Sequence, residues 1–203
     1  MDPLPIWRVV LPVAIVFLAS LVALMRPVRL LRIVVLCILA MSAYGMIHDQ
    51  FTARLCPEYF TVLHRPITGL SDPTWLGITW GFLGAWWGGL LLGLLAAAAA
   101  TLGKWPRLGA GDVLILLILL CVATGLSTLA TGVVEYISAT EASQTVTVAE
   151  PYASLIPAPR RASCYAVAYV HRTAYFTALV GGLVLCAWIV FVRYRKHADG
   201  PTL

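Results

Sequence analysis

The chain has 203 residues, of which 61% are hydrophobic and only 11% are charged, and its net charge is +5. Soluble domains carry about 25% charged residues, so this composition excludes an ordinary water-soluble fold and indicates a protein surrounded mainly by lipid. The basic residues lie at the ends of apolar runs, without the motifs of a nucleic-acid-binding protein, and we expect no nucleic-acid partner.

Five apolar segments predict five membrane-spanning helices, at residues 7–25, 28–47, 73–100, 113–134 and 173–192. Each segment approaches or exceeds the ~20 residues that a helix needs to cross a bilayer. None shows the alternation of a barrel strand, so we predict an all-α integral membrane protein with a single transmembrane domain, residues 1–203. The first segment lacks a small-residue cleavage site, and we therefore expect a span and not a signal peptide.

Turn residues mark several boundaries between these segments. Arg26 and Pro27 separate the first two as a tight hairpin. Asp72 is placed to cap the third helix, with Pro73 at its first helical position. Two longer connections remain, at residues 48–72 and 135–172.

Basic residues predict the orientation of the bundle. Eight lie close to membrane ends on one side, in the 26–32, 104–107 and 193–196 segments, and six lie on the other. Because cytoplasmic loops carry the excess of Lys and Arg, the first side is expected to be cytoplasmic. The N-terminus is then outside, the C-terminus is inside, and the two longer loops are extracytoplasmic.

Small residues recur every four positions along the third segment, at Gly77, Gly81, Ala85, Gly89 and Gly93. A stripe of this kind lets a second helix approach closely, so we interpret it as a helix-packing seam. The neighbouring helix could belong to this chain or to another membrane subunit.

Polar residues gather where the predicted spans reach the outer face. His48, Glu135 and His171 lie at span ends of similar depth, and the first outer loop adds Asp49, Glu58 and His64. Imidazole and carboxylate groups bind divalent transition metals such as Zn, Mn or Fe, and helical bundles house such sites. We therefore predict a metal site drawn from His48, Glu58, His64, Glu135 and His171, with Glu58 or Asp49 as a catalytic base. The chain has no Glu-x-x-His or His-x-x-x-His pair, and a solvated polar rim or a haem site between His48 and His171 stays an alternative.

Two of the five cysteines, Cys56 and Cys164, fall in the predicted outer loops, where an oxidising compartment permits a disulfide. The other three lie inside spans and are interpreted as packing residues. Cys164 precedes His171 by seven residues, which is two helical turns on one face. A Cys56–Cys164 bond is therefore predicted to draw Glu58 toward the His171 face.

The stretch HDQFTARLCPEYFTVLH resembles an uncharacterised family of bacterial polytopic membrane proteins. Three motifs over most of the chain carry the resemblance. The first is a His-Asp-Gln and Pro-Glu-Tyr-Phe-Thr…His pattern, matched by His48, Asp49, Gln50, Pro57, Glu58, Tyr59, Phe60, Thr61 and His64. The second is a Trp-Trp-x-Gly stretch in the third segment, matched by Ala85, Trp86, Trp87 and Gly89. The third is a late His…Tyr…Gly-Gly pattern, matched by His171, Tyr175, Gly181 and Gly182. Arg65 stands between His64 and the following proline, which departs from the pattern. The resemblance implies that the protein lies in a bacterial cytoplasmic membrane and that the residues of these motifs are important. It does not imply an activity.

Three functions are compatible with these patterns. A metal-binding and possibly catalytic site at the outer rim is favoured slightly, and a non-enzymatic accessory or scaffold subunit of a larger membrane complex is the main alternative. A transporter ranks last, because no charged residue lies deep in a span and no inverted repeat is visible. The sequence leaves open whether the protein is an enzyme.

Overall fold

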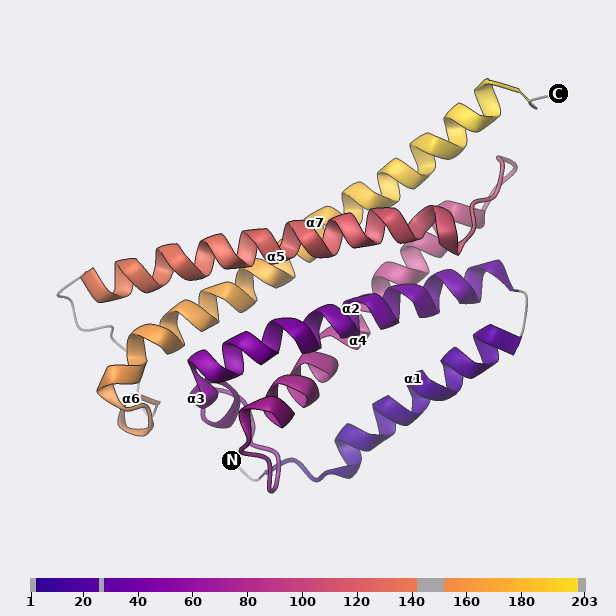
Figure 1. Cartoon of the computed structure of the whole chain (residues 1–203). Helices are drawn as coiled ribbons and strands as arrows, with labels where there is room; N and C mark the ends of the chain where they lie inside the picture. The colour runs from indigo at the N-terminus through magenta and orange to yellow at the C-terminus, as the bar shows by residue number, and fades with distance from the viewer. Residues whose placement is uncertain (1–2, 26–27, 142–151, 201–203) are drawn as a thin grey trace.

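The computed structural model describes residues 3–25, 28–141 and 152–200, and this part of the chain consists of helices joined by short loops. The helices are α1 (Trp7–Met25), α2 (Arg29–Leu55), α3 (Pro57–Thr61), α4 (Pro73–Thr101), α5 (Ala110–Glu141), α6 (Tyr152–Leu155), a short 3-10 helix (Ala158–Arg160) and α7 (Arg161–Ala198). The long helices pack on one another with their axes inclined, and α7 crosses α5 obliquely (Figure 1). The all-α architecture is as predicted.

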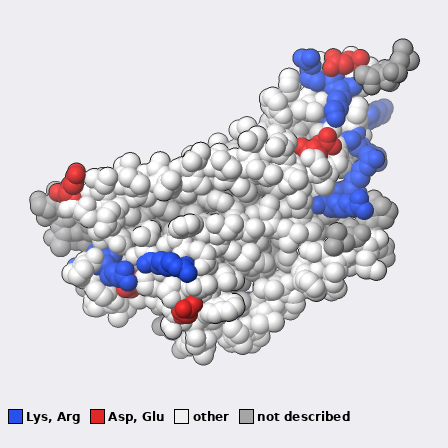
Figure 2. Space-filling model, viewed as in Figure 1, with Lys and Arg blue, Asp and Glu red and all other residues white. Residues whose placement is uncertain are grey.

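Four of these helices, α2, α4, α5 and the segment ending in α7, are long and apolar enough to cross a membrane. The space-filling view shows charged side chains at the two ends of the molecule and a broad band without them in between (Figure 2). A protein that spans a bilayer needs such an uncharged band, because the hydrocarbon core is ~30 Å thick. The chain is therefore a helical membrane protein.

The helices extend beyond the predicted spans. α2 continues eight residues past Ile47, and α7 begins at Arg161, twelve residues before the predicted start. With 38 residues, α7 is about 57 Å long and exceeds the thickness of the hydrocarbon core. The described residues of the predicted outer loops are thus largely helical, because a fall in hydropathy does not end a hydrogen-bonded helix.

α1 has 19 residues and lies at the edge of the bundle, beside α2 and α4 (Figure 1). Among its described side chains, Val16 alone is buried. The segment before it is fixed by a backbone hydrogen bond from Leu4 N to Pro66 O of 2.7 Å. The predicted hairpin at Arg26 and Pro27 lies outside the described residues.

The N-terminus of α4 begins as predicted. The carboxylate of Asp72 accepts hydrogen bonds from the backbone N–H groups of Thr74 and Trp75, at 3.0 and 3.1 Å, and Pro73 follows at the first position. Capping satisfies donors that have no partner within the helix.

The C-terminus of α4 is closed by a buried arginine from α7. Arg193 Nε donates to Pro106 O at 2.8 Å, and Nη2 donates to Leu102 O at 2.7 Å. The side chain is 3% exposed. A cation at a helix C-terminus is favourable because the last carbonyls carry partial negative charge.

The small-residue stripe of α4 packs against α2. A Cβ atom built on Gly89 would lie 2.7 Å from Ile38 Cα, and one built on Gly93 would lie 2.8 Å from Val34 Cα. At the centre, the backbones of Gly45 and Gly81 are in contact, with Ala85 beside them. The seam is therefore occupied by α2 of the same chain, and a partner subunit could use this face only by displacing α2.

Gly81→Ala is expected to lower the free energy of unfolding by about 1–3 kcal/mol, because the added methyl group meets the rigid backbone of Gly45. Gly88→Ala is the matched control, since a Cβ there meets nothing within 4 Å. Thermal unfolding of both variants in detergent measures the difference. Equal stabilities would contradict the tight packing of α2 on α4.

Candidate functional site

The candidate site is built around a carboxylate near the C-terminal end of α2, six residues before the helix ends. Asp49 is 5% exposed. Its Oδ1 lies 2.9 Å from Nδ1 of the neighbouring His48 and accepts a 3.3 Å hydrogen bond from Thr52 Oγ1. A carboxylate buried in this way needs such partners, because removing it from water is costly.

His171 of α7 faces this pair from the opposite side. Its Nε2 lies 3.6 Å from Asp49 Oδ1, which is too long for a hydrogen bond. The imidazole rings of His48 and His171 meet edge to face, with centroids 5.0 Å apart. Two helices that are separated by more than 100 residues in sequence thus converge on one carboxylate.

The Nε2 atoms of His48 and His171 are both buried without a hydrogen-bond partner. With a carboxylate oxygen of Asp49, the two histidines offer three ligand atoms within 4.8 Å of one another. Because Nδ1 of His48 is placed to donate to Asp49, its Nε2 is left with a free lone pair. Metal-bound histidines usually donate their other ring N–H to a carboxylate, a backbone carbonyl or a water molecule.

Aromatic rings from α3 cover the other side of His171. The Tyr59 ring stacks on its imidazole with centroids 4.4 Å apart, and Phe60 meets the same ring at 5.7 Å. Burial raises the pKa of Tyr59, so its phenol stays protonated across the physiological range. The short helix α3 therefore fixes the orientation of His171.

His64 lies next to this wall and outside the ligand group. Its Nδ1 is 2.8 Å from the carbonyl oxygen of Tyr59, and its ring packs between Tyr59 and Trp80, at 4.7 and 5.0 Å. A nitrogen that donates to a carbonyl is engaged in positioning the loop. The described geometry does not bring His64 to the carboxylate of Asp49.

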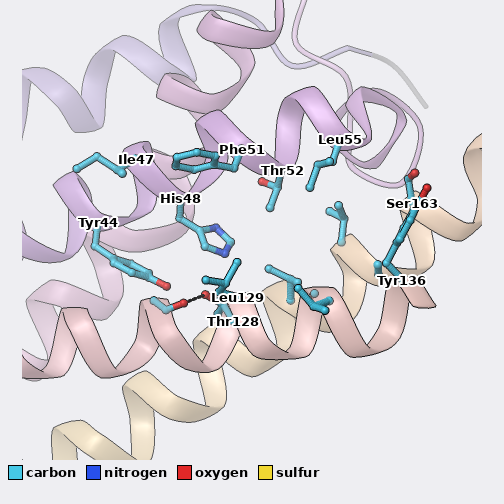
Figure 3. Close-up of a pocket in the computed structure, with 16 residues that line it drawn as sticks. Tyr44, Ile47, His48, Phe51, Thr52, Leu55, Thr128, Leu129, Tyr136 and Ser163 are labelled. Atoms are coloured by element: carbon cyan, nitrogen blue, oxygen red, sulfur yellow. Dashed lines mark hydrogen bonds between the residues drawn. The ribbon is translucent and has the colours of Figure 1, made fainter. Parts of the chain in front are cut away.

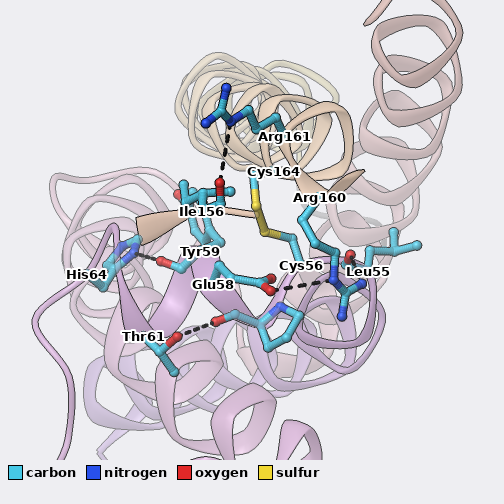
Figure 4. Close-up of a disulfide and its surroundings, with 11 residues drawn as sticks. Leu55, Cys56, Glu58, Tyr59, Thr61, His64, Ile156, Arg160, Arg161 and Cys164 are labelled. Atoms are coloured by element: carbon cyan, nitrogen blue, oxygen red, sulfur yellow. Dashed lines mark hydrogen bonds and ion pairs between the residues drawn. A yellow bond between two sulfur atoms is a disulfide. The ribbon is translucent and has the colours of Figure 1, made fainter. Parts of the chain in front are cut away.

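A disulfide joins Cys56 and Cys164, the pair that the sequence predicted, and ties the end of α2 to the first turn of α7 (Figure 4). Its Cα atoms are 5.3 Å apart. Cys164 lies two turns before His171 on the same helix, so the bond fixes the register between the two histidine-bearing helices.

Glu58 lies beside the disulfide and not beside the histidines. Its Oε1 lies 3.4 Å from Nε of Arg160, and Arg160 also donates to Leu55 O at 3.3 Å (Figure 4). Glu58 Oε2 is buried without a hydrogen-bond partner. Although Glu58 lies near the sulfur atoms of Cys56 and Cys164, disulfide sulfurs are not thiolates and do not form a metal site with it.

Glu135 is half-buried on α5. Within the described part of the chain, neither Glu135 nor His64 belongs to a group of three possible ligands within 4.8 Å of one another. Of the five predicted metal ligands, the structure thus brings together His48 and His171. It adds Asp49, which the sequence had suggested as a base.

A cavity of about 590 Å³ adjoins the site between α2, α5 and α7 (Figure 3). His48 and Tyr44 point into it from α2, and Thr128 and Leu129 face them from α5 (Figure 3). Neither this cavity nor a role for Tyr44 was predicted from the sequence. The signal for Tyr44 was its spacing, because residues four apart share a helix face and Tyr44 precedes His48 by four.

Loss of the disulfide by Cys164→Ser is expected to lower the free energy of unfolding by about 2–4 kcal/mol, because the bond closes a separation of 108 residues. Cys121→Ala serves as the control, since Cys121 is a free cysteine. Peptide mapping without reductant should recover the linked Cys56 and Cys164 peptides. Alkylation of both thiols in unreduced protein would contradict the bond.

Comparison with known protein families, with curated proteins and with solved structures finds no match to this chain. The function must therefore be argued from the geometry of the site.

Proposed function

We propose that His48, Asp49 and His171 bind a divalent transition metal, such as Zn, Mn or Fe, at the outer end of the bundle. The observation that carries this proposal is the pair of buried Nε2 atoms without a hydrogen-bond partner beside a buried carboxylate. A cation held by one nitrogen from each imidazole and by a carboxylate oxygen, which lie within 4.8 Å of one another, would offset the charge of Asp49. Two imidazoles and one carboxylate are a donor set suited to these metals.

Three protein ligands favour a reactive site over a purely structural one, because structural zinc sites are usually closed by four protein ligands. A metal held in this way supplies Lewis acidity for activating water or polarising a carbonyl or phosphoryl group. The chain's own residues orient the donors: Tyr59 stacks on His171, and Asp49 holds the proton at Nδ1 of His48. Glu58, paired with Arg160, is not placed to act as the base.

A hydrogen-bonded brace in an accessory or scaffold subunit is the second candidate. The ring packing of His171, Tyr59 and His64 favours it, because these contacts fix the α2–α3–α7 junction without any ligand. Such a subunit would meet its partners through the lipid-facing sides of α5 and α7, which expose many large apolar side chains.

Elemental analysis of purified protein separates the two candidates. Wild type is expected to carry about one metal ion per chain, and His48→Ala and His171→Ala are expected to carry almost none. Asp49→Asn should weaken metal binding by at least roughly tenfold, because it removes the anionic ligand of the three and also the carboxylate contact to His48. His197→Ala is the matched control, because His197 is exposed and stacks on Trp105 at the opposite end of the molecule. Wild type that stays metal-free after reloading with Zn, Mn and Fe would favour the brace.

We further propose that α1 is a fifth span of a bacterial cytoplasmic membrane protein with its N-terminus outside and its C-terminus inside. Two observations support α1 as a span: it has 19 residues, and its apolar side chains are mostly exposed. The bias of basic residues supports the orientation. The bacterial location rests on the family resemblance.

Labelling of intact cells with a membrane-impermeant maleimide tests the orientation. Thr68→Cys and Lys104→Cys form a matched pair, because both positions are exposed and they lie at opposite ends of α4. Thr68→Cys should react in intact cells, and Lys104→Cys should react only after the membrane is opened. The reverse pattern would invert the topology and place the histidine site at the cytoplasmic face.

A further inference from the structure

A groove lies where α4 ends against α7, at the end of the molecule opposite to His48 and His171. Its volume is about 340 Å³, within the range of about 300–1,000 Å³ that is typical of small-molecule sites. The last turn of α4 and the loop that follows form one wall, and Val190 and Arg193 of α7 form the other. The groove therefore lies between two helices that are long and apolar enough to cross a membrane.

This groove is apolar at one end and basic at the other. Ala98, Ala99 and Val190 line the apolar end, and all three lie inside the predicted spans that end at residues 100 and 192. Lys104 and Trp105 line the other end, beyond the last residue of α4. A molecule that matches this lining places its apolar part toward the bilayer core and its charged part toward the water.

The apolar end of the groove is open at the depth of the membrane. Val190 is 41% exposed although it lies within a predicted span, and a side chain exposed at this depth faces hydrocarbon chains and not water. At the other end, Trp105 packs on Tyr194 with ring centroids 5.7 Å apart. Trp and Tyr are enriched where membrane helices reach the headgroups. The groove thus crosses the boundary between hydrocarbon and headgroups.

Two cations line the groove without a carboxylate beside them. Arg193 is 3% exposed and donates only to backbone carbonyl oxygens, at the end of α4 and in the loop after it. Within the described part of the chain, no carboxylate lies within 4.0 Å of Lys104 or Arg193. Asp112 and Asp199, at the same end of the molecule, pair with other basic residues at 3.8 and 4.0 Å. Since carbonyl dipoles carry no net charge, the groove keeps a positive potential.

The lining selects the class of ligand. Figure 2 shows Lys and Arg side chains gathered at this end of the molecule, so an anion is attracted to it. A soluble anion would leave the apolar end of the groove unused, and an uncharged lipid would leave the two cations without a partner. Basic pockets between membrane helices suit anionic lipid headgroups.

We propose that this groove binds an anionic phospholipid, with its phosphate at Lys104 and the start of one acyl chain along Ala98, Ala99 and Val190. Arg193 stays bonded to the carbonyls of α4 and adds positive charge from the floor of the groove. The site is remote from the histidines, so this inference goes beyond the proposed metal site and stands or falls independently of it.

Lipid retention tests the proposal. Full-length protein in detergent is mixed with equal amounts of phosphatidylglycerol and phosphatidylcholine that carry the same acyl chains, and bound lipids are counted by native mass spectrometry. Phosphatidylglycerol should be retained at least roughly fivefold better, the effect of one cation near the membrane surface. Equal retention would overturn the proposal. Prior incubation with inorganic phosphate should leave the lipid bound, relative to chloride at the same ionic strength, and its displacement would assign the groove to a soluble anion instead.

Charge variants separate this groove from the general basic surface. Lys104→Gln should lower the preference for phosphatidylglycerol roughly fivefold, and Lys104→Arg should keep it, because the charge is retained. Arg29→Gln is the matched control: Arg29 is exposed at the start of α2, on the same side of the bundle, and does not line the groove. Equal loss in Lys104→Gln and Arg29→Gln would attribute the preference to overall charge and reject the site.

Photolabelling locates the acyl chain. A phosphatidylglycerol with a diazirine near the glycerol end of one chain, in phosphatidylcholine nanodiscs, should label the peptides that contain Leu102 and Val190, which are 64% and 41% exposed. Excess unlabelled phosphatidylglycerol should remove this label. Ala98→Leu narrows the apolar end and should reduce the label, whereas Ala123→Leu, at an exposed position of α5, should not. Label spread evenly over the exposed faces of α5 and α7, or equal label in the two variants, would overturn the placement of the lipid.

Discussion

Burial of the Asp49 carboxylate is the constraint on which the disulfide-bonded end of the molecule depends. At 5% exposure, this group cannot be stabilised by water, so the protein must supply its compensation. His48 and Thr52 do so from α2, and His171 comes from α7. Because α7 has to reach Asp49, the crossing of α2 and α7 is fixed at this depth. The disulfide at Cys56 and the ring of Tyr59 hold it there.

The glycine seam between α2 and α4 serves the same site from the other side. A Cβ at Gly77 would lie 2.7 Å from the backbone oxygen of Asp49, so a larger residue there would push α4 away from the carboxylate. Trp80, one turn further along α4, packs on His64 and thereby on the α3 segment. The small residues of α4 let its backbone approach α2, and this approach brings Trp80 close enough to pack on the segment that covers His171.

The sequence was sufficient for the architecture and for the parts of the site that depend on residue type and depth. Hydropathy located the long helices, the spacing of small residues marked the packing face, and the outer position of Cys56 and Cys164 indicated their bond. It was not sufficient for the ligand group. His48 and Asp49 are adjacent in sequence, and neighbours on a helix do not normally face each other, so only the tertiary contact with His171 shows the carboxylate between two imidazoles. Glu58 was drawn away by Arg160, an ion pair that no spacing rule predicts.

The division of the site between α2 and α7 has a consequence for biogenesis. When α2 leaves the ribosome and enters the membrane, more than 100 residues remain to be made before His171 is synthesised. During that interval Asp49 lacks its cover, and the Cys56 thiol lacks its partner. Such a nascent chain exposes a carboxylate that has only its partners within α2, His48 and Thr52, and water. α7 therefore completes the bundle by covering Asp49, which the first half of the chain leaves exposed. Oxidation of Cys56 with Cys164 makes this final step hard to reverse.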